Sequence, residues 1–333
     1  MGTRLLEVNH LKTSFFTTAG EVKAVNDVSY YVDEQEVIAI VGESGCGKSV
    51  TQMSVMQLIQ SPPGKIVGGE VLLRGKNLLE YKADSKEMQA IRGAEISMIF
   101  QEPMTALNPV YTVGNQLTEV IRRHKKVGRK EAWELGVKAL EAVAIPDPQR
   151  RMKNYPFEMS GGMRQRVLIA IALACESRLI IADEPTTALD VTIQAQVMEL
   201  LQNIVEKYKT SLVIVTHNLG LVTRHTQRIY VMYAGRIVES GTTRELITQP
   251  RHPYTMGLLK SVPRLEETAD GQLIPIQGTP PNLADVPDEC AFKPRCPYAC
   301  EGCEKGAYPS LRQVQGDNHF VACHLDIRGE EQE

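Results

Sequence analysis

The sequence contains no long apolar run and no secretion signal. No stretch of about 18 apolar residues, the length that a membrane-spanning helix needs, occurs among its 333 residues. The first residues, MGTRLLE, lack the apolar centre of a signal peptide. We therefore expect a cytoplasmic protein that depends on partner subunits for any membrane span.

The sequence also has little net charge, and it has few cysteines outside one short segment. Lys and Arg number 37 against 40 Asp and Glu, so the net charge of −3 gives no overall signature of nucleic-acid binding. Cys46 and Cys175 are isolated, whereas the other five of the seven cysteines lie between Cys290 and Cys323. In a reducing compartment such crowding favours a metal centre over disulfides.

The strongest motif is a glycine-rich loop at residues 42–49, GESGCGKS, which fits the pattern G-x-x-x-x-G-K-S. The apolar residues 36–41 predict a buried parallel strand before the loop, and residues 50–60 carry helical apolar spacing after it. Glycines let successive N–H groups face one anion at the N-terminus of the helix. Lys48 is then placed to reach the β- and γ-phosphates of a nucleotide, and Ser49 to ligate a bridging Mg²⁺.

Polar residues follow three further apolar runs that are typical of buried strands. Gln101 comes after the first run, Asp183 and Glu184 end the second, and His217 follows the third. In open α/β sheets ligands bind at the carboxyl ends of the strands. We expect Asp183 to hold Mg²⁺ through water and Glu184 to orient or deprotonate an attacking water. Taken alone, two acids after a strand also fit a turn, and a lone histidine is more often structural.

Other segments complete the predicted organisation. Alternating residues predict antiparallel strands at 5–8 and 22–32, and a strand closed by a turn at 68–75. Helical periodicity at 113–123 and 130–145 indicates an inserted helical lobe, and residues 229–241 predict a hairpin. From Pro250 the composition shifts toward Pro, Gly and Cys, which indicates an appended module.

The sequence Ser160-Gly161-Gly162 precedes an apolar helix predicted over residues 167–175. Ser160 is well placed to cap this helix, and the two glycines permit a ligand to approach its N-terminus closely. Many helices begin in this way, so this motif is weak when it is taken alone.

Taken together, these motifs resemble the ATP-binding-cassette family in content, order and spacing over residues 4 to 250. The matching parts are the glycine-rich loop, Gln101, SGGM at 160–163, the strand 179–184, ALD at 188–190 and His217. The resemblance is closest to the ATPase subunits of bacterial dipeptide and oligopeptide importers. It rests on FQEPMTALNP at 100–109, MSGGMRQR at 159–166, HPYT at 252–255 and CAFKPRCPYA at 290–299.

Two positions depart from the family pattern. Met159 stands where the family usually has Leu, a change that conserves volume and that we expect to be tolerated. Met163 stands where many cassettes have Gln, which removes a side-chain hydrogen-bonding group but is common in this branch.

The resemblance implies an α/β P-loop NTPase fold of the ABC type. Its expected parts are an antiparallel β subdomain, a helical subdomain inserted at about residues 102–165 and a small Cys-rich C-terminal module. Residues 1–250 are expected to form the ATP-binding domain and residues 251–333 the module.

The resemblance also implies the residues that bind ATP and Mg²⁺. Phe15 fits the family's aromatic position for the base better than Phe16, because of its spacing before Ala24 and Val25. The implied nucleotide contacts are Phe15, Val25, Gly42, Glu43, Ser44, Gly45, Cys46, Gly47, Lys48, Ser49, Val50, Asp183, Ser160, Gly161, Gly162 and Asp190. The implied Mg²⁺ ligands are Ser49 and Gln101, and the implied catalytic residues are Glu184, His217 and Gln101.

The expected function is ATP hydrolysis that energises the uptake of dipeptides or oligopeptides. The implied partners are a second, non-identical ABC ATPase subunit, two transmembrane permease subunits and, indirectly, an extracytoplasmic peptide-binding protein, with no nucleic acid. The chain would then lie at the cytoplasmic face of the cell membrane.

Two alternatives to peptide uptake stay open. One is an importer ATPase for nickel or another small solute, since the sequence does not fix the solute. The other is a soluble ABC protein that acts on nucleic acid or ribosomes. The second is disfavoured because the chain has one G-x-x-x-x-G-K-S motif and no sustained heptads.

The cysteines of the tail predict a metal centre. Intervals of five, six and nineteen residues separate Cys290, Cys296, Cys303 and Cys323, and they lack the paired C-x-x-C of a zinc ribbon. Cys300 and Cys303 do form one such pair, so zinc stays an alternative, as do plain or disulfide-bonded thiols. Members of the resembled family carry the other four cysteines, which implies a structural [4Fe–4S] cluster and leaves Cys300 as the spare.

Overall fold

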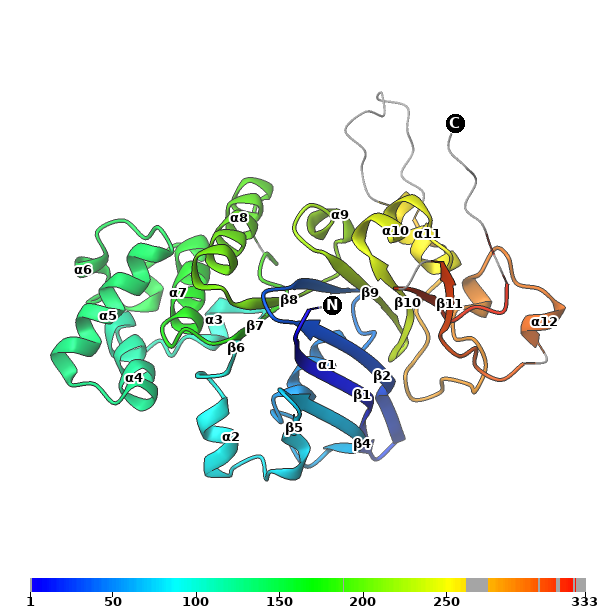
Figure 1. Cartoon of the computed structure of the whole chain (residues 1–333), viewed down its shortest axis with the longest axis horizontal. Coiled ribbons are helices and arrows are strands. Elements are labelled where there is room, and N and C mark those ends of the chain that lie inside the picture. The colour runs from blue at the N-terminus through cyan, green and yellow to red at the C-terminus, as the bar shows by residue number, and fades with distance from the viewer. Residues whose placement is uncertain are drawn as a thin grey trace. The chain divides into compact units, whose positions relative to one another are not determined.

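The computed structural model describes residues 2–187, 189–261, 275–304, 306–315, 318–325 and 327. Its chain divides into two compact units (Figure 1). The first is formed chiefly by Glu80–Ile214, and the second by Arg4–Val32, Val37–Leu79 and the described residues from Val215 onward. Among the described residues, no helix is both long enough and apolar enough to span a membrane.

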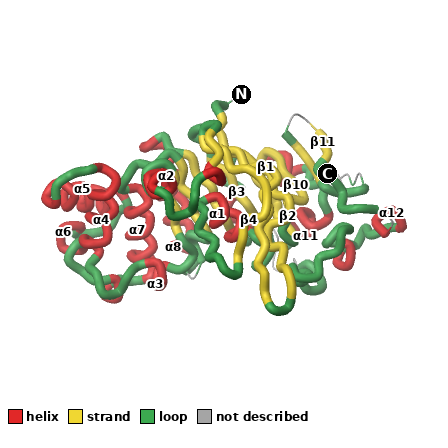
Figure 2. Tube along the Cα trace, turned by 90° about the horizontal axis from the view of Figure 1, so that it is seen from below, coloured by secondary structure: helices red, strands yellow, loops and turns green. Residues whose placement is uncertain are grey.

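The second unit contains an antiparallel sheet formed by the N-terminal part of the chain. Its strand order is β2-β1-β4-β5, and Figure 2 shows the long strands β1, β2 and β4 side by side. The strands are β1 (Arg4–Thr17), β2 (Gly20–Asp33), β4 (Gly64–Leu73) and β5 (Lys76–Asn77). The predicted antiparallel strands are therefore confirmed, and β1 is longer than predicted because alternate burial continues along it.

The glycine-rich loop of the second unit joins a buried strand to a helix, as predicted. All five residues of β3 (Val37–Val41) are buried, and α1 (Lys48–Val55) begins at Lys48. The prediction of a helix through residue 60 was wrong at its C-terminal end. Gln57 adopts a left-handed φ of 49°, and Pro62 and Pro63 follow, which cannot donate helical hydrogen bonds.

Further strands of the second unit follow the order β11-β12-β10-β9-β3. β3 and β9 pair in parallel, and β10 pairs antiparallel with both β9 and β12. The strands are β9 (Arg228–Tyr233), β10 (Arg236–Thr242), β11 (Arg312–Gln315) and β12 (His319–Val321). The predicted hairpin turns at Ala234 and Gly235, whose φ angles of 46° and 78° suit a tight hairpin turn.

Short helices complete the second unit. They are α9 (Leu219–Val222), α10 (Thr243–Thr248), α11 (Pro253–Lys260) and α12 (Glu301–Glu304). Segments on both sides of residue 250 belong to this unit, because β10 pairs with β12.

The first unit combines three strands with seven helices among its described residues. Its strand order is β8-β7-β6, and β6 and β7 pair in parallel. The strands are β6 (Ile96–Ile99), β7 (Leu179–Asp183) and β8 (Ser211–Thr216), whose last two residues belong to the second unit.

The helices of the first unit include the predicted helical segments (Figure 1). They are α2 (Lys86–Ile91), α3 (Pro103–Ala106), α4 (Val113–Lys125), α5 (Arg129–Ala142), α6 (Pro148–Arg151), α7 (Gly161–Leu173) and α8 (Val191–Tyr208). Helix α4 buries Val113, Leu117 and Ile121, the stripe expected from its spacing.

Candidate nucleotide site

The predicted nucleotide-binding residues are divided between the two units. The second unit holds Phe15, Val25, the loop and first helical turn of residues 42–50, and His217. The first unit holds Gln101, residues 160–162, Asp183, Glu184 and Asp190.

Backbone geometry makes glycine necessary within the phosphate loop. Gly45 and Gly47 have φ angles of 81° and 102°, which side chains other than glycine rarely adopt. A Cβ atom on Gly47 would also collide with the carbonyl oxygen of Ala24. The loop therefore depends on close contact between its own backbone and the backbone of β2 at Ala24, which precedes the predicted nucleotide contact Val25.

Lys48 is buried at the start of α1, and its ammonium group turns back over the loop. Its Nζ donates to the carbonyl oxygens of Gly42 at 2.7 Å and of Glu43 at 2.9 Å. These neutral acceptors hold the cation above the loop, where a phosphate can replace them with stronger charge-assisted bonds. The position agrees with the role predicted for Lys48.

Main-chain hydrogen bonds brace the loop from the β9–β10 turn. Gly235 N–H donates to the carbonyl of Cys46 at 2.9 Å, and its own carbonyl accepts from Asn26 N–H at 2.8 Å. Val25, which precedes Asn26, is buried. Burial raises the pKa of the Cys46 thiol, so this cysteine is a neutral, space-filling residue of the loop.

The two candidate aromatics for the base differ in environment. Phe15 is half-buried and pairs with Gly64 across β1 and β4, whereas the side chain of Phe16 is 52% exposed. Phe16 N–H donates to the carbonyl of Pro63 at 2.9 Å. Either ring is accessible enough to stack on a base, and Phe15 stays our prediction. His217 is exposed directly after β8 in the same unit.

The acid pair of the first unit lies where the sequence predicts it, at the end of β7. Asp183 and Glu184 are both buried, and Glu184 has a left-handed φ of 48°. The hydroxyl of Thr187 donates to Glu184 Oε2 at 2.5 Å. Thr187 was missed by the sequence reasoning, although its position three residues after an acid permits this local hydrogen bond. It fixes the direction of the Glu184 carboxylate.

Ser160 and Asp190 both cap helices in the first unit. The Ser160 hydroxyl accepts from Met163 N–H at 3.3 Å, which confirms the predicted cap of α7. Asp190 Oδ1 accepts from Ile193 N–H at 3.0 Å at the start of α8, while Ala188 lies outside the described residues. A Cβ atom on Gly161 would meet no atom within 4 Å, so a ligand has room at this helix start.

Gln101 and Met159 complete the candidate positions of the first unit. Gln101 is exposed just after β6. Its side chain is therefore accessible to a ligand at this strand end. Met159 is buried, so it fills the place of the family's usual leucine. The replacement conserves apolar volume there.

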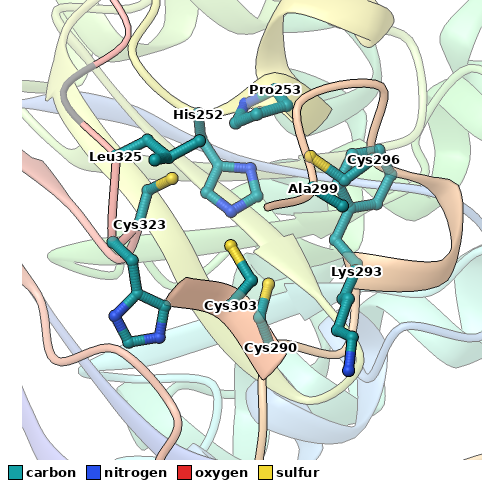
Figure 3. A pocket seen from close by; sticks show the side chains of 11 residues that line it. His252, Pro253, Cys290, Lys293, Cys296, Ala299, Cys303, Cys323 and Leu325 are labelled. Carbon is teal, nitrogen blue, oxygen red and sulfur yellow. The ribbon is translucent and has the colours of Figure 1, made fainter. Parts of the chain in front are cut away.

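The four predicted ligands of the tail line one cavity in the second unit. Cys290, Cys296, Cys303 and Cys323 line a small, partly open cavity with a volume of about 20 Å³, beside His252 (Figure 3). Cys300 does not line this cavity and is exposed, although its Sγ lies 3.8 Å from that of Cys303. No group of three or more His, Cys, Asp or Glu in the described part of the chain is arranged to ligate one metal ion.

The protonation of these side chains follows from their burial. Burial raises the pKa of Cys290 and Cys323, and that of Cys296 to about 11, while it lowers the pKa of His252 to about 4. Cys290, Cys296 and Cys323 are therefore neutral thiols at neutral pH, and His252 is a neutral imidazole.

Comparison with known proteins agrees with these observations. The family described as ABC transporter matches residues 25–187, and the family described as the C-terminal region of oligopeptide/dipeptide transporters matches residues 238–303. The oligopeptide transport ATP-binding protein OppD of Bacillus subtilis is 52% identical over 97% of this chain and 89% of its own length. The dipeptide transport ATP-binding protein DppD of Bacillus subtilis is 50% identical over 98% of this chain and 96% of its own.

Solved structures show the same fold. The dimeric structure of MJ0796, described as a bacterial ABC transporter cassette, aligns with a TM-score of 0.64 at 26% identity, covering 72% of this chain and 99% of that one. A dimeric post-hydrolysis state of MJ0796 bound to ADP and Pi aligns with the same TM-score at 25% identity and the same coverage.

The phosphate loop, the acid-ended strand and the capped glycine pair thus define an ATPase of the ATP-binding-cassette class. The matched C-terminal family and the relatives at about half identity narrow this class. The chain belongs to the ATP-binding proteins of the oligopeptide and dipeptide ABC transporters.

Proposed function

We propose that the chain hydrolyses ATP to drive the uptake of dipeptides or oligopeptides through transmembrane permease partners at the cytoplasmic face of the membrane. The observation that carries this proposal is near full-length similarity to an oligopeptide and a dipeptide transport ATP-binding protein. Residues 1–250 would form the ATP-binding domain, with a helical subdomain at about 102–165, and residues 251–333 the Cys-rich module. The composition shift from Pro250 supports this division, while the β10–β12 pairing joins the two parts into one sheet.

Chemistry at the site follows from the roles of individual side chains. Lys48 and the loop N–H groups would bind the β- and γ-phosphates, Phe15 would stack on the base, and His217 would contact the γ-phosphate. Ser49 and Gln101, with Asp183 through water, would hold Mg²⁺, which neutralises phosphate charge when bound. Glu184, oriented by Thr187, would accept a proton from the attacking water.

A second cassette is part of this proposal. Ser160 and Gly161 are exposed at a helix N-terminus with open space beside them, a position suited to an anion that another chain holds. Asp190 is exposed at the start of α8, where it can contact such a chain. The partner would be a related, non-identical ATPase subunit, so that each ATP lies between one phosphate loop and the other chain's Ser160 region.

The assembled transporter tests the proposed solute. Reconstituted with its permease subunits and binding protein in vesicles, it should take up labelled dipeptide or oligopeptide only when ATP is present on the cassette side. Uptake of nickel and not of peptide would replace the peptide assignment with the small-solute alternative. Co-purification with ribosomes or nucleic acid and without membrane proteins would contradict both.

The first unit carries an exposed apolar surface that supports docking to a permease. Its exposed large side chains between residues 100 and 157 are Phe100, Met104, Val110, Tyr111, Tyr155 and Phe157. The rings of Tyr155 and Phe157 stack at 5.5 Å, and Val113 N–H donates to the carbonyl of Asn154 at 2.9 Å, which brings the two segments together. Exposed aromatic side chains such as this stacked pair are typical of a protein interface. Its proposed partner is a short cytoplasmic helix of the permease.

Replacement of Phe157 by Ser should weaken association with the permease by about tenfold, since the ring is 69% exposed and its loss removes an aromatic anchor. ATP binding by the free subunit should not change. Val67→Ser, which alters an exposed apolar residue of β4, is the matched control. Equal co-purification of permease with both variants, measured in detergent, would exclude this surface as the docking site.

We propose that the cysteine-lined cavity binds a [4Fe–4S] cluster. A tetrahedral zinc ion with Zn–S bonds of about 2.3 Å holds its sulfur ligands about 3.8 Å apart. Among the described cysteines, only the sulfurs of Cys300 and Cys303 lie in contact at this distance. Four thiols that line one cavity match the four thiolate ligands of an iron–sulfur cluster. The cluster would crosslink Cys290, Cys296, Cys303 and Cys323 and so stabilise a segment with little apolar core. Zinc is the competing occupant.

A further inference from the structure

The side chain of Glu43, the second residue of the phosphate loop, is held by an arginine from the Cys-rich segment. Arg295 Nη1 lies 2.6 Å from Glu43 Oε2, and Nη2 lies 2.9 Å from Oε1, so the guanidinium and the carboxylate form a bidentate pair. The side chain of Arg295 is only 4% exposed, and that of Glu43 is 27% exposed. A paired, largely buried geometry of this kind is far more constraining than a surface ion pair.

Arg295 is itself fixed in orientation by further acceptors of the second unit. Its Nε donates to the carbonyl of Gln277 at 2.9 Å, and its Nη1 also donates to the hydroxyl of Tyr233 at 3.3 Å. Its Nη2 donates to the carbonyl of Ile276 at 3.4 Å. These hydrogen bonds hold the guanidinium where it reaches the phosphate loop, so its position depends on the fold of the segment around residues 276–295.

The backbone of Glu43 is held as well. Its N–H donates to the hydroxyl of Tyr254 at 2.7 Å, and Tyr254 is completely buried at the start of α11. The ring of Tyr254 packs against Tyr233 and Phe292 at centroid distances of 4.6 and 5.4 Å. Both the main chain and the side chain of Glu43 are thus attached to residues that lie after the ATP-binding sequence motifs.

These attachments have two consequences for a nucleotide. They fix the start of the loop before ATP arrives, which lowers the entropy lost on binding. They also neutralise the carboxylate of a loop residue, whose unpaired negative charge would disfavour the binding of phosphates to the same loop. The carbonyl of Glu43 further accepts from Lys48 Nζ at 2.9 Å, so the same residue positions the phosphate-binding lysine.

We propose that Arg295 and Tyr254 are positioning residues of the phosphate loop, through which the Cys-rich segment sets the affinity for ATP. The proposal rests on ATP binding at this loop. It goes beyond the structural role of the tail, because the tail then contributes to the nucleotide site of its own chain.

Arg295→Gln in the full chain tests the contact between the Arg295 and Glu43 side chains. We expect the Kd for MgATP to rise by about five- to tenfold, because the loop loses its anchor and Glu43 keeps an unpaired charge. Adding Glu43→Gln should restore at least half of the loss on a logarithmic scale, since it removes that charge. Tyr254→Phe, which keeps the aromatic packing, should raise the Kd by about threefold.

Lys293→Gln is the matched control. Lys293 lies in the same short 3₁₀ turn, Lys293–Arg295, and pairs with Glu289 at 2.9 Å instead of with the loop. The Kd of the Lys293→Gln variant for MgATP should stay within twofold of the native value. Calorimetry gives the Kd, and metal content and melting temperature are measured on every variant.

A Kd for Arg295→Gln within twofold of the native value would overturn the proposal. So would an equal rise in Kd in Lys293→Gln, or a rise in Arg295→Gln that Glu43→Gln does not reduce, since either would indicate general damage to the tail. Failure of the native protein to bind ATP would instead contradict the proposed function, so the two failures can be told apart.

Discussion

Glu184→Gln should lower ATP turnover by about 100-fold or more, while the Kd for ATP stays within about twofold of the native value. The amide has nearly the same shape as the carboxylate and can still accept the hydrogen bond from Thr187, but it cannot take a proton from water. The contacts of Lys48 within the phosphate loop are untouched by this change. A variant that loses ATP turnover but still binds ATP is therefore the result expected if Glu184 accepts the proton.

Two further variants test whether Glu184 acts in hydrolysis and not in nucleotide binding. Lys48→Ala should weaken nucleotide binding itself, because it removes the buried cation of the loop. Thr187→Val keeps the volume but removes the hydroxyl that orients Glu184, so turnover should fall by about tenfold with little change in binding. Turnover is measured on the assembled transporter in vesicles. Native turnover in Glu184→Gln would remove Glu184 from the catalytic role.

The same variant reports on assembly. If each ATP lies between two cassettes, blocked hydrolysis should trap the closed pair, and light scattering of Glu184→Gln mixed with its partner cassette and MgATP should show a dimer. The native subunit alone should bind ATP but hydrolyse it slowly. Vigorous hydrolysis by a strictly monomeric native preparation would contradict the shared site.

The local structure around the candidate site that the sequence predicts correctly is the structure that local chemistry determines. In the phosphate loop, Gly45 and Gly47 are required by left-handed backbone angles, and the buried strand before them is visible as a continuous apolar run. Ser160 is likewise predictable as a cap, because the hydrogen bond from Met163 N–H spans three residues. Such interactions need no knowledge of the tertiary structure.

Interactions across long sequence separations could not be predicted in this way. Arg295 and Glu43 are 252 positions apart, and neither residue has a local pattern that indicates its partner. Buried Glu239 similarly accepts from His319 Nε2 at 2.8 Å and from the N–H groups of Arg251 and His252, which ties β10 to β12 and to the start of α11. From the sequence alone the tail was an appended module, whereas its described residues reach the phosphate loop.

The length of α1 illustrates a different limit. Apolar spacing continues to residue 59, so periodicity alone predicts a helix through Gln60. The helix ends at Val55 because tertiary packing places Gln57 in a left-handed conformation before the prolines. There the Gln57 side chain contacts the carbonyl of Leu78, which stabilises the turn. Apolar periodicity indicates which side chains are buried, but it does not indicate the residue at which the helix ends.

Cys303→Ser should abolish the metal content of the tail, whereas Cys300→Ser should retain it. Cys303 is buried in the cavity with Cys290, Cys296 and Cys323, while Cys300 is exposed and lies outside the lining. The Cys303→Ser variant should also melt at a lower temperature, since a crosslinking centre contributes folding free energy to a segment with little core. The pair is matched because the two residues belong to the same C-x-x-C sequence.

Iron, sulfide and zinc are assayed on protein purified without oxygen, for the native chain and both variants. A [4Fe–4S] cluster predicts about four iron and four sulfide per native chain, in line with the composition of such clusters. Zinc is the competing occupant, because the 3.8 Å separation between the Cys300 and Cys303 sulfurs is the distance expected for two ligands of one zinc ion. Stoichiometric zinc without iron would exclude the cluster. Loss of metal in Cys300→Ser but not in Cys303→Ser would overturn the choice of ligands, because the exposed thiol would then be the one that binds.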